Sequence, residues 1–138
     1  MSLKYLLDTN VVSEPLRPMP RHGVLRKLAR HADEIAISSV VWHELTFGAE
    51  RLPASRRRDA IVRYLNGVVL ATMPILDYDR AAAEWHAKER ARLAARGETP
   101  PFVDGQIAAI AHVHELILVT FNDAHFRQFH GLRVLSWQ

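Results

Sequence analysis

Short apolar runs alternate along this chain with longer segments whose apolar residues recur at helical spacing. The runs predict four strands, at Lys4–Leu7, Ile35–Ser38, Leu116–Thr120 and Arg133–Ser136. The segments between them are long enough to supply the helical crossovers that parallel strands require. This alternation predicts an α/β layer fold built on a central sheet.

Seven helices are expected in the remaining segments. They cover residues 10–17, 22–32, 39–51, 56–72, 79–96, 102–114 and 123–129. Three prolines between positions 15 and 20 end the first helix, and the stretch from Gly97 to Pro101 separates the fifth helix from the sixth. Because no linker or repeat is present, we expect residues 1–138 to form one domain.

Composition narrows the chemistry that such a domain can perform. The chain has no cysteine, which excludes disulfides, thiolate zinc sites, iron–sulfur clusters and cysteine nucleophiles. The N-terminal sequence reaches Asp8 before the apolar region of a signal peptide develops, and no apolar run is long enough to span a membrane. We therefore expect a cytoplasmic protein without a membrane partner.

Four acidic residues fall where a parallel α/β sheet gathers its ligands. Asp8 directly follows the first predicted strand, and Asp123 lies just beyond Thr120, which ends the third. Asp104 falls in the first turn of one predicted helix and Glu44 in the second turn of another. The carboxyl ends of parallel strands share an edge with the N-termini of their crossover helices. The pattern therefore predicts that these acids meet at one edge.

Converging carboxylates repel one another unless a cation is present, so the pattern indicates a divalent-metal site. Oxygen ligands without cysteine or paired histidine favour Mg²⁺, with Mn²⁺ as a substitute, and such ions act on phosphates. Each acid also has an ordinary structural explanation. Asp8 can cap a helix, Asp104 can complement a helix dipole, Glu44 can lie on an exposed face and Asp123 can be a turn residue.

At these residues the sequence resembles the PIN-domain family, in particular the VapC-like toxin ribonucleases of prokaryotic toxin–antitoxin modules. The resemblance spans essentially the whole chain. Its motifs are LLDTN at Leu6–Asn10, SSVVWHELTFGAERL at Ser38–Leu52, PFVDGQIAAIA at Pro101–Ala111 and LVTFNDAHF at Leu118–Phe126. The resemblance implies an αβα sandwich with a mainly parallel central sheet and an Mg²⁺-dependent endoribonuclease. It also implies products with 5′-phosphate and 3′-hydroxyl ends, a frequent homodimer and a cognate antitoxin that inhibits the site.

Residue by residue, Asp8, Glu44 and Asp104 match the three main acids of the family, which hold the metal. The fourth acidic position stays open between Asn122 and Asp123, because relatives carry T-x-D or T-x-N-x-x-D there.

Two further matching residues, Asn10 and Thr120, are expected to orient carboxylates or waters, and Asn122 is a third candidate for this role. Asn10 occupies the place of the second aspartate of haloacid-dehalogenase-like phosphatases, which disfavours that alternative.

Basic residues are a second feature of the sequence that bears on RNA binding. The chain has 18 Lys and Arg against 15 Asp and Glu, and fifteen of the eighteen are Arg. Five of these arginines, if they border the crevice, would hold the RNA backbone: Arg17, Arg21, Arg56, Arg57 and Arg58. Ordinary solvent-facing charge explains them equally well. The rival to a nuclease is a non-catalytic PIN-like module that binds RNA or a partner protein.

Overall fold

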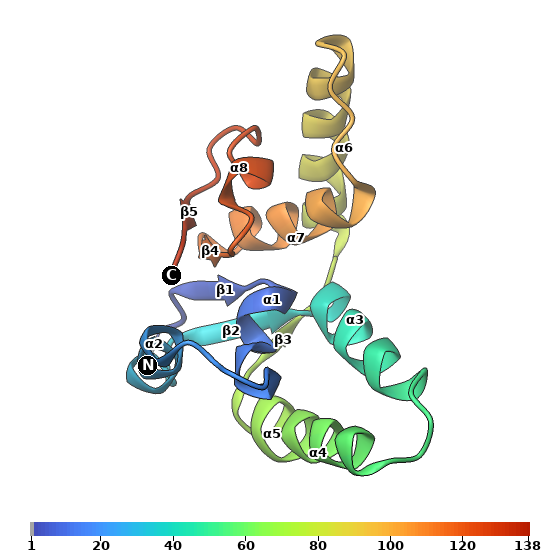
Figure 1. The fold of residues 1–138 in the computed structure, drawn as a ribbon. Helices are drawn as coiled ribbons and strands as arrows, with labels where there is room; N and C mark the ends of the chain where they lie inside the picture. Colours follow the sequence, from blue (N-terminus) through green and yellow to red (C-terminus); the bar gives the residue numbers. More distant parts are fainter. Residues whose placement is uncertain (1) are drawn as a thin grey trace.

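The structure, a computed structural model that describes residues 2–138, has one central sheet of five strands (Figure 1). The strands are β1 (Tyr5–Leu7), β2 (Ile35–Ser38), β3 (Ile75–Leu76), β4 (Ile117–Val119) and β5 (Val134–Leu135). Their order in the sheet is β3-β2-β1-β4-β5, and every neighbouring pair is parallel. The predicted α/β architecture with a mainly parallel central sheet is confirmed.

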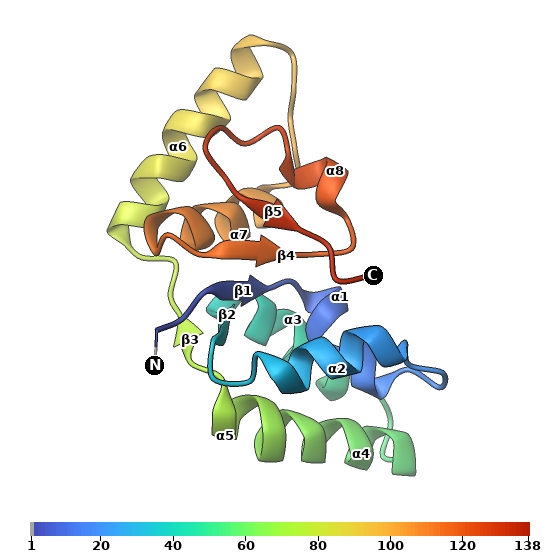
Figure 2. The same cartoon turned by 90° about the vertical axis from the view of Figure 1, so that its left-hand side faces the viewer.

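Helices flank this sheet on both sides (Figures 1 and 2). They are α1 (Thr9–Val12), α2 (His22–Arg30), α3 (Ser39–Glu50), α4 (Arg56–Tyr64), α5 (Leu70–Thr72), α6 (Arg80–Ala95), α7 (Phe102–Val113) and α8 (Asp123–Phe126). A 3₁₀ turn covers Glu14–Leu16, and a π-helical turn at Leu65–Val69 joins α4 to α5. Within residues 2–138 no helix combines the length and the apolar character needed to cross a membrane.

Three elements differ from the sequence-based expectations. The helix expected over 10–17 is divided, because Pro15 lies at the start of the separate 3₁₀ turn. The helix expected over 123–129 ends at Phe126. The strand β3 was not predicted, because two residues are too short to show a periodicity. Its pairing is tertiary: the Ile37 N–H of β2 donates to the Pro74 carbonyl at 3.0 Å, just before β3 begins.

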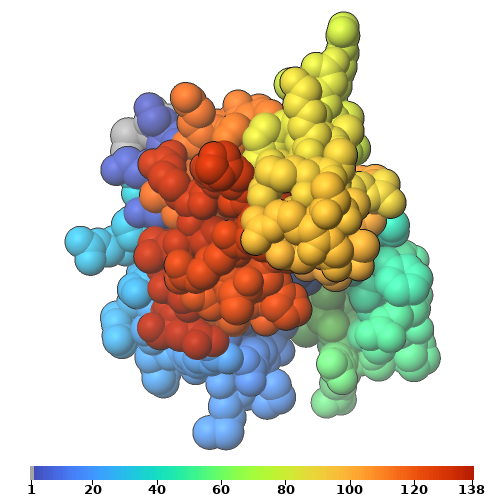
Figure 3. All heavy atoms as spheres, turned by 90° about the horizontal axis from the view of Figure 1, so that it is seen from above, coloured from blue at the N-terminus to red at the C-terminus, as the bar shows by residue number. Residues whose placement is uncertain are grey.

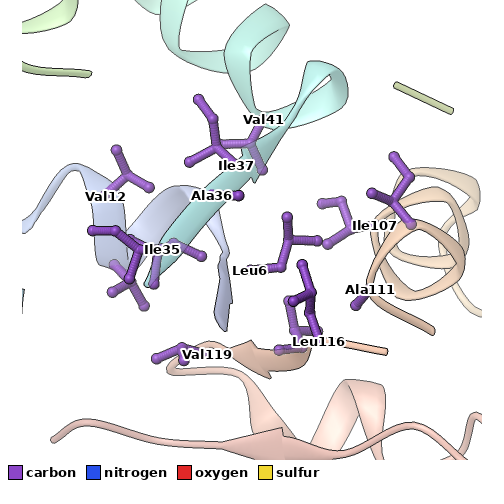
Figure 4. Close-up of a cluster of buried hydrophobic side chains, with 14 of the residues drawn as sticks. Leu6, Val12, Ile35, Ala36, Ile37, Val41, Ile107, Ala111, Leu116 and Val119 are labelled. Atoms are coloured by element: carbon purple, nitrogen blue, oxygen red, sulfur yellow. The ribbon is translucent and has the colours of Figure 1, made fainter. Parts of the chain in front are cut away.

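The core lies between the sheet and the helices on its two faces. Figure 4 shows Leu6 of β1 among the residues of β2, with Val12 of α1 on one side and Ile107 of α7 on the other. All three of these side chains are 0–1% exposed. Covered on both faces, β1 and β2 carry continuous apolar runs rather than an alternating pattern. Full burial of each such side chain contributes about 1.5–3 kcal/mol.

The C-terminal segment is fastened to α6 (Figure 3, where the red and orange C-terminal residues lie against gold α6). Arg92 donates to both carboxylate oxygens of Glu89 at 2.9 Å and to the Gln128 carbonyl at 2.9 Å. Glu89 in turn accepts the His130 N–H at 2.6 Å. This cluster holds the chain between α8 and β5 against the long helix.

Candidate metal centre

Asp8 is the most firmly held acid of the candidate site. It follows β1 and caps α1, where its Oδ1 accepts the Thr9 N–H at 2.8 Å. Its Oδ2 accepts the Thr120 hydroxyl at 2.7 Å, and its own N–H donates to the Val119 carbonyl at the end of β4. The residue is only 8% exposed. Strand ends and helix start together fix this carboxylate in one orientation.

The charge of Asp8 is uncompensated. Burial raises the pKa of its carboxyl above the usual value, and the hydrogen bonds from Thr120 and Thr9 lower the pKa by a smaller amount. In the part of the chain that the structure describes, no cationic side chain contributes to this balance. A buried carboxylate without a positive partner is costly, which is the condition that a bound cation relieves.

Glu44 is joined to Asp8 through the intervening threonine. It lies in the second turn of α3, whose N-cap Ser38 ends β2 and accepts the Val41 N–H at 3.0 Å. The Thr9 hydroxyl donates to Glu44 Oε2 at 3.0 Å. Partial burial raises the pKa of Glu44, and the negative charges of Asp8 and Asp104 raise it further.

Asp104 enters from the first turn of α7. The pKa of its carboxyl is raised first by burial and then by the charge of Asp8, while His125 lowers it. The His125 Nδ1 is 3.9 Å from Asp104 Oδ2, and that imidazole is largely exposed. The next residue, Gly105, allows α7 to pack closely, since a Cβ there would lie 2.1 Å from His86 Nε2. Asp104 therefore depends on a tight helix–helix contact for its position.

Asp8 follows a strand, and Glu44 and Asp104 lie within the first two turns of α3 and α7, so all three acids belong to one edge of the sheet, where the charge of Asp8 acts on both of the others. They are not, however, gathered into a closed ligand set. Within residues 2–138, no group of three or more His, Cys, Asp or Glu side chains lies close enough together to hold one metal ion. The donor chemistry fits a hard divalent cation, because the available atoms are carboxylate oxygens. Coordination by all three acids would require Glu44 or Asp104, which are more exposed than Asp8, to rotate or to bind through water.

The residues expected to orient the acids differ in what they contact. Thr120 is fully buried; its hydroxyl donates to Asp8 and accepts the Asn122 N–H at 3.0 Å. Asn10 Oδ1 accepts the Phe121 N–H at 3.4 Å, which ties α1 to the loop after β4. Asn122 contributes its backbone to this network, and its exposed side chain makes no capping hydrogen bond to α8.

Asp123 lies apart from the three interacting acids. It is the first residue of α8, and its carboxylate pairs with Arg127 at 2.9 Å. Arg127 is the main cause of its lowered pKa, and none of the other three acids contributes to that shift. The structure thus joins Asp8, Glu44 and Asp104 in one electrostatic group and gives Asp123 a different partner.

Sequence reasoning overlooked two residues that organise the site. Thr9 links Asp8 to Glu44 through its backbone N–H and its hydroxyl. Gly105 permits the contact of α7 with α6. Each had a signal in the sequence, a threonine directly after a helix-capping aspartate and a glycine inside a predicted helix.

Comparisons with known proteins agree with this architecture. The sequence profile of the PIN domain matches residues 5–132. The tRNA(fMet)-specific endonuclease VapC of Shigella flexneri is 35% identical over 135 residues, which cover 98% of each chain. The crystal structure of FitAcB from Neisseria gonorrhoeae superposes with a TM-score of 0.88 at 29% identity, covering 96% of this chain and 97% of that one. For DNA-bound VapBC from Salmonella typhimurium the TM-score is 0.86 at 29% identity, and 99% of each chain is covered. The chain therefore belongs to the PIN domain family.

Proposed function

We propose that this chain is a metal-dependent endoribonuclease, the toxin of a VapBC-type toxin–antitoxin module, which hydrolyses RNA phosphodiester bonds with Mg²⁺ or Mn²⁺. One observation carries the proposal. Asp8 is a buried carboxylate without a cationic partner in the described residues, and its charge raises the pKa of both Glu44 and Asp104. The relatives named VapC endonuclease or ribonuclease support the same activity.

The three acids have distinct roles in this proposal. Asp8 is the fixed ligand, because Thr9 and Thr120 orient both of its oxygens. Glu44 and Asp104 complete the site from α3 and α7. When bound, the divalent ion supplies charge neutralisation at the scissile phosphate and makes water a stronger nucleophile. Asn10 and Thr120 keep the loop after β4 next to Asp8, which preserves the spacing of the site.

Partners follow from the same proposal. The substrate is RNA, and a cognate antitoxin binds the toxin and blocks the acidic site. Similar chains have been solved as VapBC and FitAcB assemblies, which supports this expectation. We also propose a homodimer that acts in the cytoplasm, where RNA is available.

A non-catalytic PIN-like module that binds RNA or protein is the second candidate. The observation that favours it is the lack of a closed three-ligand group in residues 2–138. A module of this kind would bind its partner equally well with or without a divalent ion.

Cleavage and metal binding measured together separate the two candidates. Labelled RNA is incubated with Mg²⁺, Mn²⁺ or EDTA, and Mn²⁺ binding is followed by titration calorimetry. Asp8→Asn is expected to abolish both cleavage and tight Mn²⁺ binding. The matched control is Asp33→Asn, at an exposed residue between α2 and β2, and it should leave both unchanged. Cleavage that survives Asp8→Asn would refute the site, and wild-type protein that binds no Mn²⁺ and cuts no RNA would favour the non-catalytic module.

The same assay decides the role of Asp123. Because Arg127 already pairs with this carboxylate, Asp123→Asn is expected to retain Mn²⁺ binding. A loss of Mn²⁺ binding as large as that of Asp8→Asn would make Asp123 the fourth ligand.

A further inference from the structure

A hollow of about 480 Å³ borders the acidic site on one side of Glu44. Its walls come from α1, from α3, from α4 and from the segment that follows α1. Both Glu44 and Thr9, which are hydrogen-bonded to each other, contribute to its lining, so the hollow is continuous with the candidate metal centre.

Three arginines line this hollow: Arg17, Arg51 and Arg57. Arg51 and Arg57 are exposed, and neither has an ion-pair partner among residues 2–138. The only acidic residue in the lining is Glu44. The guanidinium groups are therefore available for an external anion.

Arg17, unlike the other two arginines, forms an ion pair within the fold. Its Nη1 is 3.5 Å from Oε1 of Glu14, a carboxylate that is 0% exposed. The other oxygen of Glu14 accepts the Arg21 N–H at 3.1 Å. Glu14 thereby fixes the segment that carries Arg17 and Pro18 along one wall of the hollow.

Along α3, the acid and one of the free arginines share a face. Glu44, Gly48 and Arg51 are spaced i, i+4 and i+7, and all three line the hollow. At 1.5 Å of rise per residue, Arg51 is about 10 Å along the helix from Glu44. The positive charge thus lies beside the carboxylate centre without neutralising it.

A second hollow that also includes Glu44 in its lining has a different character. It is lined by His43, Phe47, Tyr78 and Val103 together with small and polar residues, and its lining includes neither Lys nor Arg. Of these two hollows, only the first is therefore lined by arginines without an ion-pair partner in residues 2–138. Arginine forks suit phosphate oxygens, because each guanidinium donates two parallel hydrogen bonds.

We propose that the hollow between α3 and α4 binds the sugar–phosphate backbone of RNA on one side of the scissile bond, with Arg51 and Arg57 contacting phosphates. The inference rests on the proposed nuclease function and adds the direction in which the substrate leaves the acidic site. A single-stranded backbone fits this role, because its contacts with arginine are electrostatic and independent of base sequence.

The test measures the affinity of a fluorescein-labelled single-stranded RNA by anisotropy over a range of KCl concentrations. All proteins carry Asp8→Asn, and EDTA is present, to prevent cleavage. Adding Arg51→Ala and Arg57→Ala together is expected to weaken binding at least about tenfold. The salt dependence, log K against log [KCl], should become shallower by about 1.4, or about 0.7 for each lost phosphate contact. Arg30→Ala is the matched control, because Arg30 is exposed, unpaired in the described chain and located where α2 leads into β2.

A second pair of variants tests the hollow without removing an arginine. Gly48 lines the hollow, and a Cβ added there meets nothing within 4 Å, so a side chain can be introduced without a clash at its first atom. Gly48→Glu is expected to weaken RNA binding more than Gly48→Gln, because only the former places a negative charge in the hollow. Equal affinities for the two variants would contradict a phosphate site.

The outcomes separate this inference from the nuclease proposal. If the wild-type protein cleaves RNA and the arginine variant is unchanged in KM and in salt dependence, RNA binding in the hollow is refuted and the nuclease proposal stands. If RNA binding depends on the arginines but the wild-type protein never cleaves RNA, the nuclease proposal is refuted and RNA binding in the hollow stands. If the arginine variant keeps its RNA affinity but loses affinity for a polyglutamate peptide, the hollow is a protein-docking surface and the inference fails.

Discussion

Gly105→Ala tests the packing that positions Asp104. Gly105 lies on α7 directly after that acid, and a Cβ there would be 2.1 Å from Nε2 and 2.6 Å from Cδ2 of His86. The imidazole has little room to retreat. It is 3% exposed, its Nδ1 is hydrogen-bonded to the Tyr78 hydroxyl at 2.8 Å, and the Phe102 ring is 4.8 Å away. Either the histidine must break its hydrogen bond or α7 must move away from α6.

Two opposing contributions determine how much Gly105→Ala changes the free energy of unfolding. Overpacking a filled contact of this kind costs about 1–3 kcal/mol. Replacing glycine by alanine inside a helix returns about 0.5–1 kcal/mol, since alanine loses less backbone entropy on folding. Gly48→Ala on α3 is the matched control, because its added Cβ meets nothing within 4 Å and only the favourable contribution applies. The two variants should differ in free energy of unfolding by about 1–3 kcal/mol.

Urea denaturation followed by circular dichroism measures this difference directly. For 138 residues, the usual unfolding entropy gives roughly 3–4 °C per kcal/mol, so the melting temperatures should differ by roughly 3–10 °C. His86→Ala would remove the obstacle, and in that background Gly105→Ala should cost less than in wild type. Equal stabilities for the two glycine variants would refute the argument that the contact with His86 requires glycine at 105.

Three further predictions concern other parts of the molecule. In metal-free protein, Asp8→Asn should raise the free energy of unfolding at pH 7 and not at pH 3. Burial raises the pKa of Asp8 above 3.8, so the wild type loses stability as pH rises through the interval above that value; urea titrations at both pH values check this. Tyr64→Phe removes a 2.6 Å hydrogen bond to the Val12 carbonyl and should cost about 1 kcal/mol at pH 7. That deficit should shrink between pH 10 and 12, because burial raises the pKa of Tyr64 to about 12 and the wild type loses stability through this interval; an unchanged deficit in denaturation at both pH values would contradict it. Glu89→Ala leaves Arg92 without its carboxylate and should cost about 2 kcal/mol, measured by thermal unfolding, with Glu84→Ala on the exposed face of the same helix as the control.

Local sequence signals predicted the fold wherever an element carries its own pattern. The apolar runs before Asp8 and before Ser39 marked β1 and β2, and residues 56–72 stayed helical in spite of a π-helical turn at Leu65–Val69. The strand Ile75–Leu76 could not be found in this way. Its two residues form a strand only through their pairing with β2, a tertiary contact that no local pattern encodes.

The sequence was sufficient to predict the backbone positions of the acids in the candidate site. Strand ends and helix starts determine where Asp8, Glu44 and Asp104 lie, because they share one edge of any parallel sheet of this order. Side-chain partners are less accessible from sequence. Asp123 and Arg127 are spaced i, i+4 and form a 2.9 Å ion pair. This spacing is typical of ion pairs on a helix and could have predicted the partner of Asp123 from the sequence.

The contrast between the three acids explains why the proposed metal centre lacks a closed ligand set in residues 2–138. Asp8 is buried and receives two hydrogen bonds, so its position is determined by the fold alone. Glu44 and Asp104 extend from helices into more solvent, and the hydrogen bond from Thr9 is the main restraint on Glu44. An ion would therefore meet one rigid ligand and two adjustable ones, and its binding energy would have to offset the loss of side-chain freedom in the latter. The negative charge of Asp8 raises the pKa of both Glu44 and Asp104, and this repulsion would keep the two adjustable acids apart until a cation arrives. Without a bound cation, electrostatics therefore favours the open arrangement of the three carboxylates.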